Sequence, residues 1–193
     1  MAEHYASHAI VKLLEVILIN STVFNICSTS LDMLKFSTEN CTETAWADFN
    51  YILVLWNPSA EVKSYAEQVA DKIVYYETNP ELRFIENLRQ CFNIGFKAGF
   101  ELSDYVAGIN TDMAFYNGWL ANLVKYADEN SIINCRQLEP NPTPHHESPF
   151  YFGETIKGKF DFAKFNSFCS SIYTDKLATE QEWQKSINNP NAR

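Results

Sequence analysis

Polar side chains directly follow four short apolar runs in this 193-residue sequence. They are hydroxyls and amides together with one carboxylate, a set that can hydrogen-bond a polar ligand. If the apolar runs are parallel strands, their carboxyl ends lie at one edge of a sheet, where ligands bind in such folds. We therefore predict that these residues converge on one site. They are Ser21 and Thr22, then Asn57 and Ser59, then Asn79, and finally Asn110 with Asp112.

Several familiar kinds of catalytic site are excluded because their motifs are missing. There is no GxGxxG dinucleotide fingerprint, no GxxxxGK[ST] phosphate loop and no GxSxG nucleophile elbow. No CxxC pair is present, which argues against a structural zinc site or dithiol redox chemistry. Scattered, buried thiols in a reducing compartment are the simplest interpretation, and we expect a cytoplasmic protein. The five cysteines are Cys27, Cys41, Cys91, Cys135 and Cys169.

The charge balance limits the possible partners. The chain has 24 acidic and 15 basic residues, a formal net charge of −9, which disfavours nonspecific binding to nucleic acid or to an anionic membrane. The most apolar stretch, residues 10–27, is interrupted by Lys12, Glu15, Asn20 and Asn25. We therefore expect no transmembrane segment and no nucleic-acid partner.

Strand and helix patterns alternate along the first two thirds of the chain. A continuous apolar run is typical of a strand buried on both faces, and spacings of three and four are typical of amphipathic helices. This order predicts a Rossmann-like α/β fold with a mostly parallel sheet and helices on both faces. The predicted strands are residues 15–20, 49–56, 72–76, 104–110 and 131–136. The predicted helices are residues 25–36, one capped by Ser59, one running from Asn79 to Gly99, and one beginning at Asn117.

The pattern changes after residue 136. Residues 137–149 contain four prolines, which predicts a long surface loop. Asp161 is placed to cap an aromatic helix, and Thr179 with Glu182 forms a capping-box signature for a last short helix. The phenylalanines of the aromatic helix predict a core or interface face. We expect a short helical C-terminal part over residues 141–193.

Three motifs resemble those of the GT-A fold glycosyltransferases of the large family 2 group. Asn57 and Ser59 match the "D-[DN]-x-S" turn, in which Trp56 replaces the leading acid. Asn93 and Gly95 match an "N-x-G" helix motif.

The third motif, Asn110-Thr111-Asp112, stands in the place of the metal-binding D-x-D motif, and Trp119-Leu120 matches the "W-L" that follows it. The resemblance covers about residues 17–140. It implies a GT-A-like nucleotide-sugar-binding domain over residues 10–140 and an incomplete acceptor-side region over residues 141–193.

The resemblance implies transfer of a sugar from a nucleotide-sugar donor to a hydroxyl acceptor, as in glycan or polysaccharide synthesis. Mn²⁺ or Mg²⁺ would bridge the donor diphosphate to Asp112, because hard cations prefer oxygen ligands. An acidic protein that binds a diphosphate needs such a cation more than a neutral protein does, because protein and ligand are both negatively charged. The implied donor-binding residues are Ser21, Thr22, Asn57, Asn79, Asn93, Asn110 and Asp112.

The general base that an inverting transferase needs is left unassigned. Glu154, Asp161 and Asp175 are candidates by charge alone. The alternative is a noncatalytic or truncated relative that binds a nucleotide or a protein, with the phenylalanines of the C-terminal helix as an interface. Trp56 and Asn110, which replace acids, favour this alternative. A nucleotidyltransferase comes third, and a homo-oligomer or a partner chain is left open.

Overall fold

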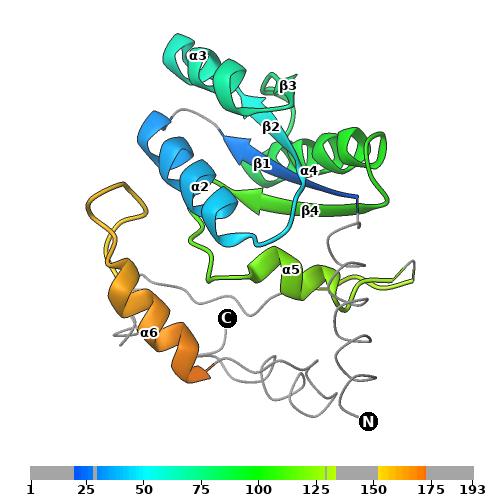
Figure 1. Ribbon diagram of the computed structural model, residues 1–193. Helices are drawn as coiled ribbons and strands as arrows, with labels where there is room; N and C mark the ends of the chain where they lie inside the picture. Colours follow the sequence, from blue (N-terminus) through cyan, green and yellow to red (C-terminus); the bar gives the residue numbers. More distant parts are fainter. Residues whose placement is uncertain (1–19, 28–29, 129, 134–151, 173–193) are drawn as a thin grey trace.

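The central element is a four-stranded sheet in which all strands are parallel and lie in the order β3-β2-β1-β4 (Figure 1). The computed structural model describes residues 20–27, 30–128, 130–133 and 152–172. β1 and β2 occupy the middle of the sheet, and nearly all their residues are buried. The strands are β1 Ser21–Cys27, β2 Asn50–Trp56, β3 Lys72–Tyr76 and β4 Tyr105–Asn110.

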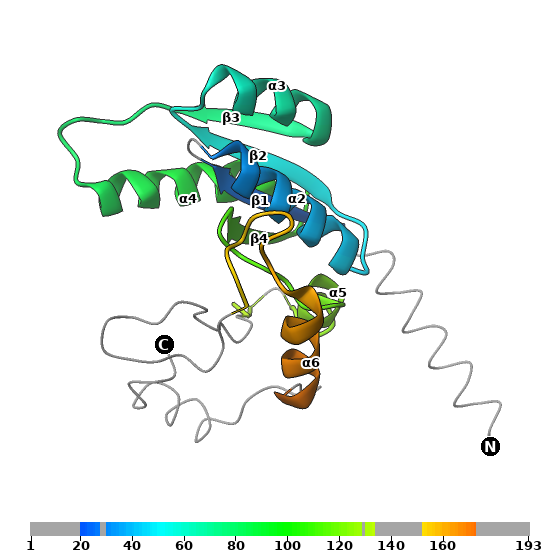
Figure 2. The ribbon, with the colours of Figure 1, turned by 90° about the vertical axis from the view of Figure 1, so that its left-hand side faces the viewer.

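Helices cover both faces of this sheet (Figure 2). One core cluster joins the sheet to α2, α3 and α5, and a second cluster joins the opposite face to α4. The expectation of an α/β fold with a parallel sheet between helices is therefore confirmed. The helices are α2 Leu31–Thr44, α3 Ala60–Val69, α4 Phe84–Phe100, α5 Trp119–Val124 and α6 Phe162–Ile172.

The second, third and fourth predicted strands are confirmed to within a residue or two at their ends. The helix cap predicted at Ser59 is also confirmed, because the Ser59 hydroxyl accepts a hydrogen bond from the Val62 backbone at 3.3 Å. An N-cap oxygen of this kind satisfies one of the free N–H groups at the start of a helix. Local sequence signals were sufficient for these elements.

The predicted end of the first strand is wrong, because the chain is in a strand directly after residue 20. Residues 15–19 lie outside the described residues, and the strand at the centre of the sheet is β1, so Ser21 and Thr22 begin a strand instead of following one. The helix predicted from residue 25 begins only at Leu31, with Ser30 as its cap. The reason is that Asn25, fully buried within β1, donates hydrogen bonds to Ser37 and Tyr51, both at 2.9 Å.

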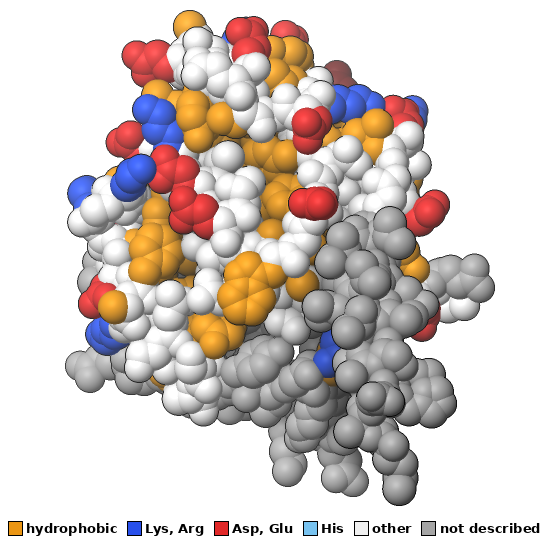
Figure 3. Space-filling view, in the orientation of Figure 1, with side chains coloured by type: hydrophobic (Ala, Val, Ile, Leu, Met, Phe, Trp, Pro, Cys, Tyr) orange, Lys and Arg blue, Asp and Glu red, His pale blue; other side chains and the backbone are white. Residues whose placement is uncertain are grey.

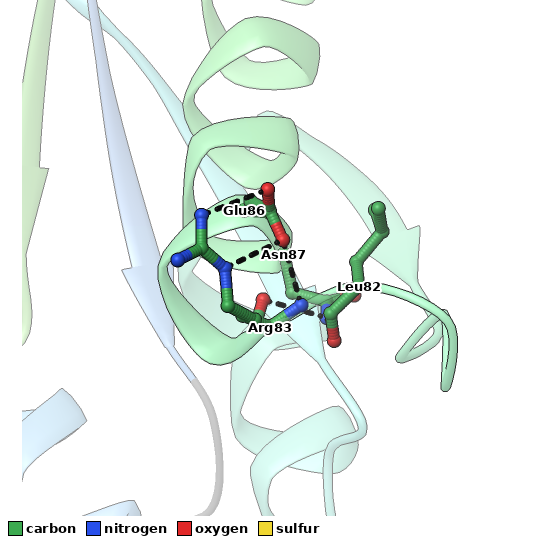
Figure 4. Close-up of polar contacts among 4 residues, drawn as sticks. All are labelled: Leu82, Arg83, Glu86 and Asn87. Atoms are coloured by element: carbon green, nitrogen blue, oxygen red, sulfur yellow. Dashed lines mark hydrogen bonds and ion pairs between the residues drawn. The ribbon is translucent and has the colours of Figure 1, made fainter.

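The start of α4 also differs from the prediction. Asn79 and Pro80 belong to a turn, and the helix begins at Phe84. Figure 4 shows the cap, in which Glu86 accepts hydrogen bonds from the Arg83 backbone and guanidinium. Asn87, buried to 1% exposure, donates to the carbonyls of Asn79, Leu82 and Arg83 at 3.1–3.2 Å. The Asn87 side chain therefore fixes the turn between β3 and α4.

Glycine lets α4 approach the sheet closely. The Phe24 ring of β1 occupies the space where a Cβ on Gly95 of α4 would lie. A Cβ on Gly108 of β4 would stand 2.5 Å from the Phe24 Cζ. Gly99 meets Val106 in the same way, at 2.6 Å. The glycines of the "N-x-G" region thus serve helix-to-sheet packing, whatever else they do.

The C-terminal helix packs through aromatic side chains. Phe152, Phe160 and Phe165 form a buried cluster with Phe36 of α2. Asp161 caps α6 as predicted, accepting from the Lys164 backbone at 2.9 Å. The predicted core role of the phenylalanines from Phe160 to Phe168 is confirmed for Phe160 and Phe165, whereas Phe162 is 37% exposed.

The remaining predictions for the C-terminal part are either wrong or lie outside the described residues. Residues 131–133 are described and are not in a strand, whereas residues 134–136 of that predicted strand lie outside the described residues. The proline loop at 137–149 and the helix start at Thr179 also lie outside them.

Candidate functional site

A crevice between β1 and β4 is expected from the strand order alone. From β1 the chain proceeds outward to β2 and β3, and then returns to place β4 on the other side of β1. In open parallel sheets, such a reversal leaves a crevice at the carboxyl ends of the two strands, and ligands bind there. The register pairs Asn110, the last residue of β4, with Ile26 near the end of β1.

Asn110 ends β4 and Asp112 follows it, at the carboxyl edge of the sheet where the strand order leads us to expect the crevice. Asn110 is half-buried and its carbonyl accepts from the Met113 backbone at 3.3 Å, which turns the chain. Asp112 is exposed, and no described residue forms a hydrogen bond or ion pair with its side chain. The N-terminus of α2, capped by Ser30, follows β1 at the same edge. A helix N-terminus carries partial positive charge that favours an anionic ligand.

Asn57 lies at the same edge, but its side chain is already engaged. Its amide donates to the Thr78 hydroxyl at 2.7 Å, and its Oδ1 accepts from the Thr78 backbone at 3.1 Å. The Trp56 indole donates to the same hydroxyl at 2.8 Å. Asn57 has a positive φ of 46°, which asparagine tolerates better than most residues. These contacts, here called the Asn57–Thr78 brace, tie the end of β2 to the loop after β3.

A surface hollow of about 470 Å³ lies beside this brace, at the outer side of β2 and β3. Asn57, Lys63, Tyr75 and Thr78 contribute to its lining. The Lys63 ammonium lies 5.6 Å from the centre of the Tyr75 ring. Sequence reasoning missed Lys63, although it lies one helical turn after Ser59 and therefore projects from the start of α3.

Asn79 is exposed in the turn after β3 and has a structural role. Its Oδ1 accepts from the Glu81 backbone at 3.0 Å, and its own N–H donates to Asn87 at 2.8 Å. Four of the predicted residues thus lie along the carboxyl edge, with Asn57 and Asn79 after β2 and β3, and Asn110 and Asp112 at the end of β4 on the other side of β1.

The other three predicted residues lie elsewhere. Ser21 and Thr22 are at the amino end of β1, where Ser21 donates to the Asp48 carbonyl at 3.2 Å and Thr22 pairs with Ser103 at 2.6 Å. Both are buried. Asn93 is exposed near the middle of α4. The expected convergence of Ser21 and Thr22 with Asn57 and Asp112 is wrong, because the two groups occupy opposite edges of the sheet.

The donor atoms at the crevice suit a hard cation that is shared with a ligand. Within the described part of the chain, no three His, Cys, Asp or Glu side chains are grouped to hold a metal. Mg²⁺, however, is commonly bound by one or two carboxylates together with substrate phosphates and water. The Asp112 carboxylate and the Asn110 amide are compatible with that mode.

Thiol chemistry is disfavoured at this edge. Cys27 ends β1 but is only 1% exposed, and burial raises the pKa of its thiol to about 12. Burial likewise raises the pKa of Cys41 to about 12. The thiolate is the reactive form of cysteine, so neither residue is a nucleophile at neutral pH. The four described cysteines are all buried and free, as the sequence predicted.

A scan of protein-family models found no match to this chain, and no curated protein matched it significantly. No described helix is long and apolar enough to cross a membrane. Figure 3 shows acidic and basic side chains interspersed over one face of the described residues, without a continuous basic area on that face.

Proposed function

We propose that the protein is a metal-assisted glycosyltransferase with a GT-A-like fold, which binds a nucleotide-sugar at the carboxyl edge of the sheet and transfers the sugar to a hydroxyl acceptor. One observation carries this proposal. Asp112, an exposed carboxylate without a described side-chain partner, follows β4 at the carboxyl edge of the sheet, where the strand order reverses beside β1.

The chemistry of each group at the edge follows from its position. Mn²⁺ or Mg²⁺, when bound, would neutralise the diphosphate leaving group. Asp112 would hold the cation, and Asn110 would contact the ribose or a water on the cation. The N-terminus of α2 would face the same negative charge. Asn57 and Asn79 would shape the nucleotide side of the site through the turns that they hold.

A noncatalytic nucleotide-binding module is the second candidate, and a specific observation favours it. Two of the three carboxylates considered as general base are engaged in other contacts. Glu154 pairs with Lys159 at 2.8 Å, and Asp161 caps α6. Asp175, the third, lies outside the described residues.

The deciding experiment is a calorimetric titration of UDP-, GDP- and dTDP-sugars with and without Mn²⁺, followed by an assay of donor hydrolysis. We expect one donor to bind in a Mn²⁺-dependent manner and to be hydrolysed slowly. Binding without hydrolysis or transfer would favour the noncatalytic module. If none of the three donors binds, both forms of the proposal fail.

Asp112→Asn tests the residue itself, and Asp104→Asn is its matched control. Asp104 is also exposed and immediately precedes β4, at the opposite edge of the sheet. We expect Asp112→Asn to weaken Mn²⁺-dependent binding by about tenfold or more, because a charged ligand of the cation is lost. Asp104→Asn should leave binding unchanged. Equal losses in both variants would contradict the assignment.

A further inference from the structure

The outer flank of α4 carries apolar side chains that the described elements cover only in part, since Phe92 and Phe96 contact Phe24 of β1 with one side of their rings. Ile85 is 58% exposed, Phe96 is 38% exposed and Phe100 is 61% exposed, while Leu88 and Phe92 are half-buried beside them. Residues spaced by three and four lie on one side of a helix. Apolar surface of this kind on a helix marks an interaction site.

The two halves of this flank have complementary shapes. In the first half, Ile85, Leu88, Arg89 and Phe92 line an apolar hollow of about 450 Å³. In the second half, the exposed rings of Phe96 and Phe100 stack on one another with their centres 6.3 Å apart. One half therefore offers a hollow, and the other offers the aromatic side chains to fill it.

A two-fold axis near the middle of α4 would bring each half against its complement. Two antiparallel copies of the helix then place Phe100 of one copy at Ile85 of the other, and Phe96 at Arg89. In such an isologous contact every pairing occurs twice. A guanidinium over an aromatic ring adds a cation–π attraction.

Charge at the border of the flank fits the same arrangement. Glu86 and Lys97 lie beside the apolar residues, on the same side of α4 and on opposite sides of its midpoint. The same two-fold axis brings Glu86 of one copy to within two residues of Lys97 of the other, about 3 Å along the helix axis, and the reverse. A membrane surface is a poorer occupant, because the chain carries a net charge of −9 and anionic lipids repel such a protein.

We propose that the α4 flank is the contact surface of a symmetric homodimer, in which the two α4 helices pack antiparallel. This inference is independent of the ligand at the carboxyl edge. It predicts an association that depends on Phe100 and Arg89 and not on exposed apolar residues elsewhere.

Sedimentation velocity of the full chain, at concentrations up to about 100 μM, is the first test. We expect a monomer–dimer equilibrium that Phe100→Glu weakens by about tenfold or more, because each dimer loses the contact twice. Ile132→Glu is the matched control, since Ile132 is 97% exposed and lies outside the flank. Far-UV circular dichroism checks that both variants are folded. A monomer at every concentration, or equal effects of the two substitutions, would overturn the proposal.

Disulfide cross-linking tests the orientation separately. A chain with Ile85→Cys and Phe100→Cys should form covalent dimers on mild oxidation. A chain with Ile85→Cys and Ile132→Cys has the same number of added thiols and should form few. Equal cross-linking in the two chains would contradict the antiparallel arrangement, whatever the sedimentation result.

Discussion

Both edges of the sheet carry polar side chains, but the two edges differ in how far these side chains hydrogen-bond to other residues of the protein. At the amino edge, Thr22 and Ser103 share a hydrogen bond of 2.6 Å, and Asn50 donates to Ser103 at 3.1 Å. Asn20 accepts from Asn50 and donates to the Leu102 carbonyl. These residues form one network that joins β1, β2 and the segment before β4.

At the carboxyl edge, Asn57 and Thr78 form a comparable brace, whereas the Asp112 side chain has no described partner. Polar residue type alone therefore does not mark a ligand site. A polar group whose bonding capacity is filled by the protein stabilises the fold, and one whose capacity is free can accept a ligand.

The largest expected effect tests whether the Cys27 thiol, at the carboxyl end of β1, is shielded from water. Burial raises the pKa of Cys27 from about 9 to about 12. Below pH 9 the thiol is neutral in both states and the stability is unaffected. Above pH 9 the unfolded chain loses the proton first, so the free energy of unfolding should fall by about 1.4 kcal/mol per pH unit for this thiol.

Denaturant unfolding of the chain and of Cys27→Ala, between pH 8 and pH 10.5, measures this slope. The variant should show a shallower fall, with the remaining slope due to other buried groups such as Cys41 and Tyr51. Parallel curves for the two proteins would mean that Cys27 contacts water at the crevice.

The next effect concerns the amino-edge network. Ser103→Ala leaves the fully buried Thr22 hydroxyl without its partner, which should lower the free energy of unfolding by about 1–3 kcal/mol. Ser64→Ala, at an exposed position of α3, is the control and should change little. Donor binding at the opposite edge should be unaffected, so a parallel loss of binding would break the contrast between the edges.

The smallest effect concerns the carboxyl-edge brace. Thr78→Val removes the hydroxyl that accepts from Trp56 and Asn57. Because these groups are exposed and water can replace the hydroxyl, we expect a loss of about 0.5–1 kcal/mol in the free energy of unfolding. Thr78→Ser retains the hydroxyl and should recover most of this loss in thermal unfolding. A loss larger than that of Ser103→Ala would reverse the proposed ranking of the two edges.

The elements predicted well from the sequence are those whose signals are local. β2 is an uninterrupted apolar run, and α3 follows a serine cap, so neither depends on distant residues. The sequence predicts the first strand too early, because Asn20, Ser21 and Thr22 resemble the polar end of a strand and Asn25 resembles a helix cap. The buried position of Asn25 depends on Ser37 and Tyr51, and such partners become visible only when the chain is folded.

The same limit applies to the candidate site. Asn57, Asn110 and Asp112 follow correctly predicted strands, so their common edge could be deduced from parallel topology. Ser21 and Thr22 were placed at that edge only because the first strand was displaced by several residues. Lys63 and Thr78 carry no local signal, since their place beside Asn57 results from the packing of α3 and the loop after β3.

The Phe24 ring between Gly95 and Gly108 ties together three positions on three different elements. None of them is free to vary alone, because a methyl group at either glycine requires a smaller residue at position 24. Substitutions there should therefore be accepted only in combination, such as Gly95→Ala with Phe24→Leu. In diverged relatives of this chain, position 24 should therefore covary with positions 95 and 108, which lie 71 and 84 residues further along the sequence.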